Sequence, residues 1–253
     1  MMSLGKFGAT ALALGAALLL SSCGDDQFPD YHYKMTVYAG GKAYSSVRAV
    51  EQKQVFSLAD SSGQSVQRRL QGEAVIIDLA DGRTAYALLS KPGEAEYALK
   101  VAGYALLPLV PEFKRDPRTD DLHVERGTES LDRMADKQRQ MVAIKGPQDL
   151  PRTRPNPDPY RGPRALDSWP MLVTFSDPKD PKTVREVAPE EIGVNRITIE
   201  ITEEPVTTGI EERLVWALNH KGALVRTRPQ ESKWDKPPAH RLNRAAFTRE
   251  SAE

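Results

Sequence analysis

The only cysteine of this 253-residue chain, Cys23, lies at the end of an apolar N-terminal stretch. A single cysteine cannot form a disulfide within the chain, so the folded body must be stabilised by packing alone. The apolar run covers residues 9–20 and follows Lys6. A helix needs about 20 apolar residues to cross a hydrocarbon core of about 30 Å, so this run is too short to be a transmembrane helix.

A basic residue, a short apolar run and small residues at its end together indicate a secretory signal peptide. The motif Leu20-Ser21-Ser22-Cys23 resembles the lipobox of bacterial lipoproteins, in which the cysteine becomes the lipidated first residue of the mature protein. We therefore expect residues 1–22 to be a signal peptide and residues 23–30 to be a lipid-anchored tether. The alternatives are ordinary cleavage, which the lack of an A-x-A pattern before the cysteine disfavours, and an uncleaved apolar N-terminus.

Lipid on Cys23 would hold the mature chain firmly, because each buried methylene contributes about 0.8 kcal/mol and two acyl chains bind far more strongly than one. In lipoproteins, an Asp directly after the cysteine often marks retention in the inner membrane. Here that residue is Gly24, and the first Asp is Asp25. The resemblance thus implies a position in the cell envelope, facing the periplasm, with the outer membrane favoured over the inner membrane.

The charge balance limits the partners that the chain can bind. Its 35 Lys and Arg residues equal its 35 Asp and Glu residues in number. A dedicated nucleic-acid binder carries a basic excess on one face, so we expect no nucleic-acid partner. The expected partners are the membrane, through lipid on Cys23, and an envelope protein.

Alternation of apolar and polar residues predicts strands, and Asp, Gly and Pro mark the turns between them. The sharpest signal is a hairpin in which residues 72–79 and 83–90 flank Asp81-Gly82. Further strands are expected at 31–38, 44–55, 171–175, 183–187 and 195–202. Helices are expected at 128–141, at 210–219 and, with a strand as the alternative, at 94–107, and one helical turn at 189–192. The predicted fold class is α+β, mainly antiparallel β-sheet with a few short helices.

The chain is rich in proline and charge over an excursion from about 108 to 168. Within it, residues 152–163 are expected to form neither helix nor strand, because proline lacks an amide donor and restricts the residue before it. A Ser/Gly/Gln loop is expected at 59–67. We predict one domain over residues 31–222, interrupted by the excursion, and a polar, partly disordered tail over residues 223–253.

Three blocks of sequence carry a resemblance: Tyr33-Lys-Met-Thr-Val with its hairpin, residues 72–89, and residues 169–187 together with 196–214. They resemble a family of uncharacterised bacterial, chiefly proteobacterial, proteins, many of them predicted to be exported or lipid-anchored. That family has no assigned activity, so the resemblance implies no catalytic or binding residue. It implies that the three blocks form one domain.

Candidate catalytic and metal-binding residues are scattered. Asp177 and Asp180 lack the alternating acids and the glycine of an EF-type calcium loop, so we expect a Pro-fixed turn rather than a metal site. The four histidines form no H-E-x-x-H motif or Cys/His cluster, so no zinc site is expected. His123, beside Asp120 and Asp121, is a candidate general base, and a solvated loop histidine is the alternative. We assign no catalytic residue and no cofactor.

The string from Thr202 to Gly209 runs from a predicted strand into a predicted helix. Thr207 or Thr208 is expected to cap that helix, with Glu211 as the reciprocal acid. The alternative is a small anion site, because backbone donors at a helix start bind anions. Paired carboxylates would serve glycoside hydrolysis only at a suitable separation, and surface charge is expected for each pair. These pairs are Glu190-Glu191, Glu203-Glu204 and Glu211-Glu212.

The sequence therefore favours a membrane-anchored envelope lipoprotein that acts as a non-catalytic binding or adaptor module, contacting its partner through loops or a sheet edge. Two alternatives stay open. One is a hydrolytic enzyme of the cell envelope that uses scattered acids and His123. The other is a lipoprotein component of a secretion or conjugation assembly.

Cys23→Ala is expected to abolish incorporation of labelled fatty acid and retention in the membrane fraction, because the substitution removes the thiol that would carry the lipid. Metabolic labelling followed by fractionation measures both effects. Retention of the variant at the wild-type level would contradict the lipid anchor.

Overall fold

The computed structural model describes residues 27–56, 64–111, 131–156, 163–219, 224 and 238–249. Every strand pair within these ranges is antiparallel, and the helices are few and short, as the sequence predicts. No helix among the described residues is long and apolar enough to cross a membrane. The predicted signal peptide, Cys23 and His123 lie outside these ranges.

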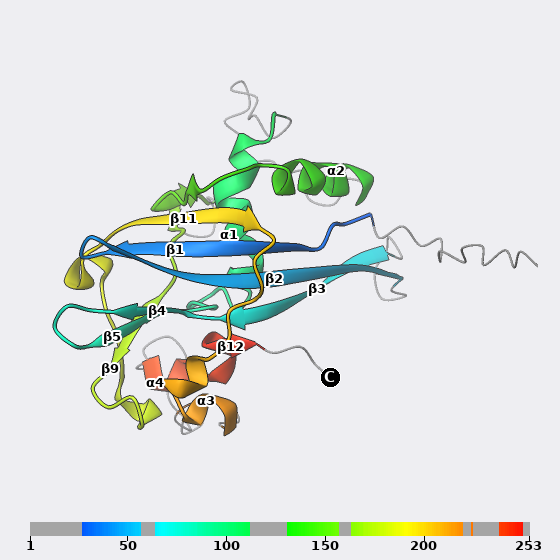
Figure 1. Ribbon diagram of the computed structural model, residues 1–253. Coiled ribbons are helices and arrows are strands. Elements are labelled where there is room, and N and C mark those ends of the chain that lie inside the picture. Colours follow the sequence, from blue (N-terminus) through cyan, green and yellow to red (C-terminus); the bar gives the residue numbers. More distant parts are fainter. Residues whose placement is uncertain are drawn as a thin grey trace, which may run out of the picture.

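The larger sheet has six strands in the order β12-β3-β2-β1-β11-β6 (Figure 1). Its strands are β1 (Tyr31–Ala39), β2 (Lys42–Phe56), β3 (Gln64–Glu73), β6 (Gln148–Asp149), β11 (Val194–Thr202) and β12 (Thr248–Arg249). The long hairpin of β1 and β2 lies at its centre, with Tyr31 opposite Val50. On the other side of β1, Tyr33 lies opposite Ile201 of β11, so strands from before and after the proline-rich excursion are neighbours.

A second sheet has four strands in the order β10-β9-β5-β4, and a third has only two. The four are β4 (Val75–Asp78), β5 (Thr84–Ala87), β9 (Leu172–Phe175) and β10 (Val184–Glu186), and the two are β7 (Thr153–Pro155) and β8 (Ala165–Asp167). The α-helices are α1 (Tyr97–Leu106), α2 (Leu131–Val142), α3 (Trp216–Asn219) and α4 (Pro238–Arg241). Short 3-10 helices are η1 (Leu107–Leu109), η3 (Pro181–Thr183), η4 (Pro189–Ile192), η5 (Ile210–Glu212) and η6 (Arg244–Ala246).

The two central strands of the four-stranded sheet, β5 and β9, are buried on both faces, and β5 shows this most clearly. Ala85 and Ala87 face the first core, which the six-stranded sheet and α1 complete with residues such as Met35 and Val101. Tyr86 faces a second core. Strands that are covered on both sides lose the polar alternation of a half-exposed strand, so β4, β5 and β9 are read in the sequence as continuous apolar runs.

The second core contains residues from the segment that was predicted to be a polar, partly disordered tail. Phe247 is fully buried there, with its ring centroid 6.2 Å from that of Tyr86 and 5.8 Å from that of Phe175. The next residues form β12, which pairs with the end of β3. Residues 238–249 are therefore part of the folded body, and the tail prediction is wrong for them.

Three other predictions need correction. Residues 64–67 extend β3 instead of forming a loop, because pairing with β2 satisfies their backbone. The predicted helix over 210–219 is divided into η5 and α3, with Val215 exposed between them. Residues 153–155 form β7 despite Pro155, because the bonds to the β8 segment come from Asn156 N and Arg152 O on either side of it.

The residues predicted as the end of the tether, Gln27–Asp30, pack against the body. Phe28 is 2% exposed, and the carboxylate of Asp30 accepts a hydrogen bond from Gln52 N at 2.6 Å. Gln52 Nε2 donates to the Pro29 carbonyl oxygen, and Arg139 Nη1 of α2 donates to that of Gln27 at 2.6 Å. The last four residues of the predicted tether therefore belong to the folded body.

The chain passes from the six-stranded to the four-stranded sheet at Glu73 and Ala74. Arg48 of β2, which is fully buried, donates from Nε to the Glu73 carbonyl oxygen at 3.1 Å, and Ser46 Oγ donates to the same oxygen at 2.9 Å. Gly72 has a φ of 129°, and a Cβ there would lie 2.9 Å from Arg48 Cγ and 3.1 Å from its Cα. The crossing therefore requires glycine, for its backbone freedom and for its lack of a side chain.

Gly72→Ala is expected to lower the free energy of unfolding by about 2–4 kcal/mol, because the positive φ and the clash with Arg48 both cost energy. Gly41→Ala is the matched control, since Gly41 has a φ of 78° with nothing described within 4 Å of the added Cβ. It should cost about 1 kcal/mol. Urea denaturation of both variants measures the difference, and equal losses would show that contact with Arg48 does not require the glycine.

Candidate functional site

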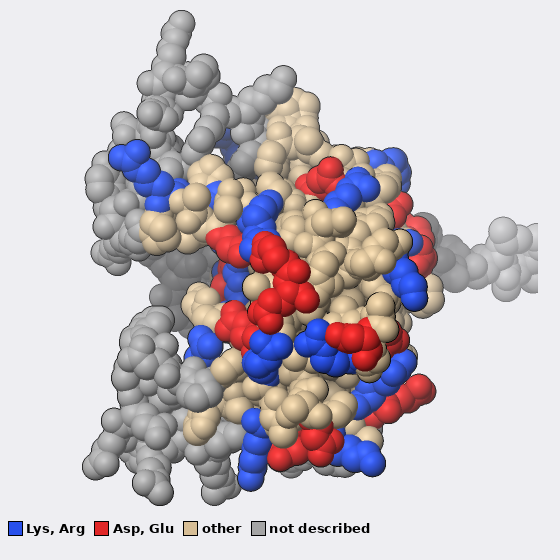
Figure 2. Space-filling view, turned by 90° about the vertical axis from the view of Figure 1, so that its left-hand side faces the viewer, with Lys and Arg blue, Asp and Glu red and all other residues tan. Residues whose placement is uncertain are grey.

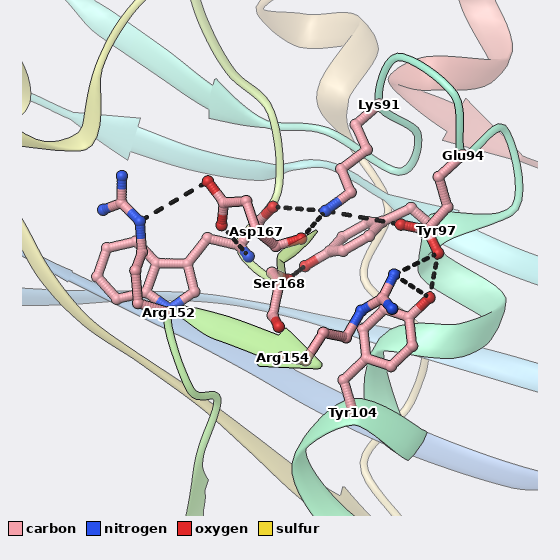
Figure 3. A network of polar contacts seen from close by, with 9 residues as sticks. Lys91, Glu94, Tyr97, Tyr104, Arg152, Arg154, Asp167 and Ser168 are labelled. Carbon is pink, nitrogen blue, oxygen red and sulfur yellow. Dashed lines mark hydrogen bonds and ion pairs between the residues drawn. The ribbon is translucent and has the colours of Figure 1, made fainter. Parts of the chain in front are cut away.

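Charged and aromatic side chains form a network where the β7–β8 hairpin lies beside α1 (Figure 3). We call it the clamp network. It joins the segment before α1 and α1 itself to the two strands and the residues next to them. Its members are Lys91, Glu94, Tyr97, Tyr104, Arg152, Arg154, Asp167, Ser168 and Trp169.

Glu94 is the central carboxylate of the clamp network. Its Oε1 accepts hydrogen bonds from Tyr104 Oη and, at 3.4 Å, from Arg154 Nη2, while its Oε2 lies 3.6 Å from Lys91 Nζ. The three charged side chains are only 12–17% exposed. Burial and the bond to the Glu94 carboxylate both raise the pKa of Tyr104, so its hydroxyl stays a donor. The Glu94 carboxylate therefore contacts two cations and a phenol hydroxyl in a partly desolvated site.

Lys91 fixes the backbone on both sides of Ser168. Its Nζ donates to the carbonyl oxygens of Asp167 at 2.5 Å and Trp169 at 3.4 Å, and it lies 4.9 Å from the centroid of the Tyr97 ring. Burial lowers the pKa of Lys91, and the nearby Glu94 carboxylate opposes that shift. With these partners the ammonium group is engaged in holding the chain, and its donors point at backbone oxygens.

Two arginines of the hairpin segment stack on aromatic rings. Arg154 lies 4.0 Å from the centroid of the Tyr104 ring, and Arg152 lies 4.6 Å from that of Trp169. Such contacts contribute about 0.5–2 kcal/mol each, with the higher values where the cation is desolvated. Arg154 is the better shielded of the two, at 17% exposure against 41% for Arg152. Arg154 is therefore the stronger link between the hairpin and α1.

Ser168 is fully buried in the clamp network, and Tyr97 Oη donates to its carbonyl oxygen at 2.9 Å. A serine nucleophile must reach its substrate and needs a base within hydrogen-bond distance. The Ser168 side chain has no exposed surface, and Lys91 Nζ bonds to the carbonyls of its neighbours. The arrangement can hold the β7–β8 hairpin against α1, and it does not form a nucleophile–base pair.

A shallow pocket of about 220 Å3 lies at a different place, where the β1–β2 turn, the β4–β5 turn and η4 meet. We call this part of the molecule the turn end. Figure 2 views the molecule from this side and shows acidic and basic side chains intermingled across it. The pocket lining includes Lys42, Tyr44, Asp81, Arg83, Glu191 and Ile192.

The pocket rim carries both signs of charge. Arg83 Nη2 lies 2.6 Å from Asp81 Oδ2, and this guanidinium lowers the pKa of the Asp81 carboxyl. The backbone N–H of Ala188, followed by the Arg185 guanidinium, lowers the pKa of Glu191. Both carboxyl groups are therefore ionised at neutral pH, so the rim presents fixed charges of both signs.

The aspartates of the predicted turn form a turn. Asp177 Oδ1 accepts a hydrogen bond from Lys179 N, and Asp180 Oδ1 accepts one from Lys182 N. The described residues contain no group of His, Cys, Asp and Glu side chains that could hold a metal ion.

Members of the predicted carboxylate pairs form separate surface ion pairs. Glu190 pairs with Arg152, Glu191 with Arg185, and Glu204 with Lys34. His123 with Asp120 and Asp121 lies outside the described residues.

The helix start after Gly209 is capped from elsewhere in the chain. The buried carboxylate of Glu73 accepts hydrogen bonds from Gly209 N at 3.2 Å and Ile210 N at 2.9 Å. Thr207 instead pairs with Val47 of β2: Val47 N donates to Thr207 Oγ1, and Thr207 N donates to the Val47 carbonyl oxygen. Capping by Thr207 or Thr208 with Glu211 is therefore the wrong prediction. The anion site is also wrong, because a carboxylate of the protein itself occupies those donors.

Comparison of the chain with protein-family models, with curated proteins and with solved structures finds no match. The resemblance to an uncharacterised bacterial family stays a prediction.

Glu94→Gln is expected to lower the free energy of unfolding by about 2–3 kcal/mol, because it leaves two poorly exposed cations without their shared carboxylate. Glu96→Gln is the matched control, since the Glu96 side chain is 64% exposed and its carboxylate lies 3.9 Å from Lys100. It should change stability by less than about 0.5 kcal/mol. Chemical denaturation of the full chain carrying Cys23→Ala compares them, and similar small losses would contradict a stabilising role for the clamp network.

Proposed function

We propose that this chain is a membrane-anchored envelope lipoprotein that acts as a non-catalytic binding or adaptor module. Its body would be an α+β domain that follows a lipoprotein signal peptide and faces the periplasm, with the outer membrane as the favoured location. The lipobox-like Leu20-Ser21-Ser22-Cys23 supports the anchor. The early start of packing, at Gln27, supports a body that is held close to that anchor.

The pocket at the turn end is the observation that carries the binding role. Small-molecule sites occupy about 300–1,000 Å3 and bury most of their ligand. This pocket measures about 220 Å3 and lies among turns. Its size suits one or two side chains of a protein partner better than a whole substrate. Fixed charges of both signs on its rim suit the specific pairing of two protein surfaces.

The clamp network supports the same function, because it holds the β7–β8 hairpin against α1. Binding residues on loops work best when a rigid scaffold positions them. A lipoprotein subunit of a secretion or conjugation assembly is one form that such an adaptor takes. We do not propose the hydrolytic alternative, because its candidate base, His123, lies outside the described residues and nothing among the described residues supports it.

A photoreactive amino acid at Lys42 is expected to crosslink a specific protein in intact envelopes, because Lys42 is exposed at the pocket rim. Adding Arg83→Glu should reduce the adduct about tenfold, which corresponds to about 1.4 kcal/mol of binding energy. Adding Lys100→Glu is the matched control, since Lys100 lies on α1 rather than in the pocket lining. An adduct that Arg83→Glu leaves unchanged, or no reproducible adduct, would contradict a binding site at the turn end.

A further inference from the structure

The body is attached to its predicted anchor at one end. Phe28 lies five positions after Cys23, and Gln27 is already bound to Arg139. A chain extends at most about 3.5 Å per residue, so the four steps from Cys23 to Gln27 reach about 14 Å. We call the surface around Gln27 the tether end. It comprises residues 27–30, α2, and the paired residues 51–56 of β2 and 64–69 of β3.

The tether end and the turn end lie at opposite ends of β1. β1 begins at Tyr31, directly after the tether-end residues, and ends at Ala39, which lines the pocket. Nine residues at about 3.3 Å each span roughly 30 Å. Figure 1 shows the start of β1 near α2 and the far end of β2 and β3, with the β1–β2 turn at the other side of the molecule.

We propose that the tether end faces and touches the phospholipid headgroups, while the turn end with its pocket points away into the periplasm. This inference rests on the proposed lipidation of Cys23. A segment that reaches only about 14 Å from Cys23 to Gln27 is too short for the body to turn over. In the inverted orientation, Gln27 would stand about 30 Å above the bilayer. The short distance between Cys23 and the first packed residue thus decides which surface a soluble partner can meet.

The side chains of the tether end suit the headgroup layer rather than the hydrocarbon core. Lys53, Arg68 and Arg69 are exposed on the β2–β3 hairpin, and Arg139 is half-exposed on α2. Long cationic side chains near an anionic surface contribute about 1 kcal/mol each. Acids are interspersed, with Glu51 beside Arg69 and Asp136 beside Arg139. We therefore expect shallow polar contact, with the covalent lipid supplying the attachment.

The described residues expose few large apolar side chains. Val215 lies between η5 and α3, whereas Leu109 belongs to η1, which contacts α2. A surface that inserted into the hydrocarbon core would carry several such side chains on its contact face. A single leucine beside α2 agrees with contact at the headgroups only.

Energy transfer to a labelled bilayer tests the orientation. Once Cys23 carries lipid, Lys53→Cys and Lys42→Cys each provide a single thiol, on the tether end and the turn end respectively. Each full-length lipoprotein is labelled with a donor dye and reconstituted in phosphatidylethanolamine–phosphatidylglycerol vesicles that contain an acceptor lipid. Transfer from position 53 should exceed transfer from position 42 at least twofold. Equal or reversed transfer in vesicle-bound protein would overturn the orientation and leave the anchor intact.

Two controls test the anchor and the effect of the short Cys23–Gln27 segment independently of the orientation. Flotation of the vesicles reports the anchor, and protein that fails to float would overturn both the lipoprotein function and the orientation. Insertion of 20 Gly/Ser residues between Asp26 and Gln27 should bring the two transfer values within about 20% of each other, because a long flexible linker no longer restricts the body. A twofold difference in energy transfer between positions 53 and 42 that survives this insertion would show that the short segment does not set the orientation.

Discussion

The buried contact of Arg48 with the crossing at Glu73 is the constraint on which the two sheets depend. β2 brings a fully buried guanidinium to the point where the chain leaves one sheet for the other, and Gly72 allows that close passage. The Glu73 carboxylate then binds Gly209 N and Ile210 N, so the same point also fixes the start of η5. Buried charges cost free energy unless they are bonded, so this junction tolerates little change. Both cores pack against strands that this junction at Glu73 positions.

Much of the sheet could be predicted because its strands alternate or form apolar runs between strong turn signals. β1, β2, β9 and β11 follow their predicted ranges closely, and Asp81-Gly82 joins β4 to β5 as expected. The bend that splits residues 72–79 between two sheets could not be predicted, because it depends on Arg48 in a distant strand. The burial of Phe247 could not be predicted for the same reason. Few of its sequence neighbours are apolar, and it packs against distant residues of the second core.

The candidate site was less predictable than the fold, for a physical reason. The clamp network joins residues up to 78 positions apart, such as Lys91 and Trp169, and no local spacing marks them. The alternation of arginine and proline around Arg152 and Arg154 is a sequence feature that could have indicated the network. Both arginines stack on aromatic rings. Capping by Glu73 was missed because capping rules consider only nearby residues, whereas this carboxylate lies 136 positions before Gly209.

The proposed anchor and the shape of the body together account for the proposed role. Gln27 is hydrogen-bonded to the body only four residues after Cys23, so a lipidated chain would present its turn end to soluble partners. The most direct test is the mass of the N-terminal peptide of the mature protein extracted from membranes. We predict a chain that begins at Cys23 and carries a diacylglyceryl group on its sulfur. A chain that begins at Met1 with unmodified Cys23, recovered from the cytosol, would contradict the anchored account.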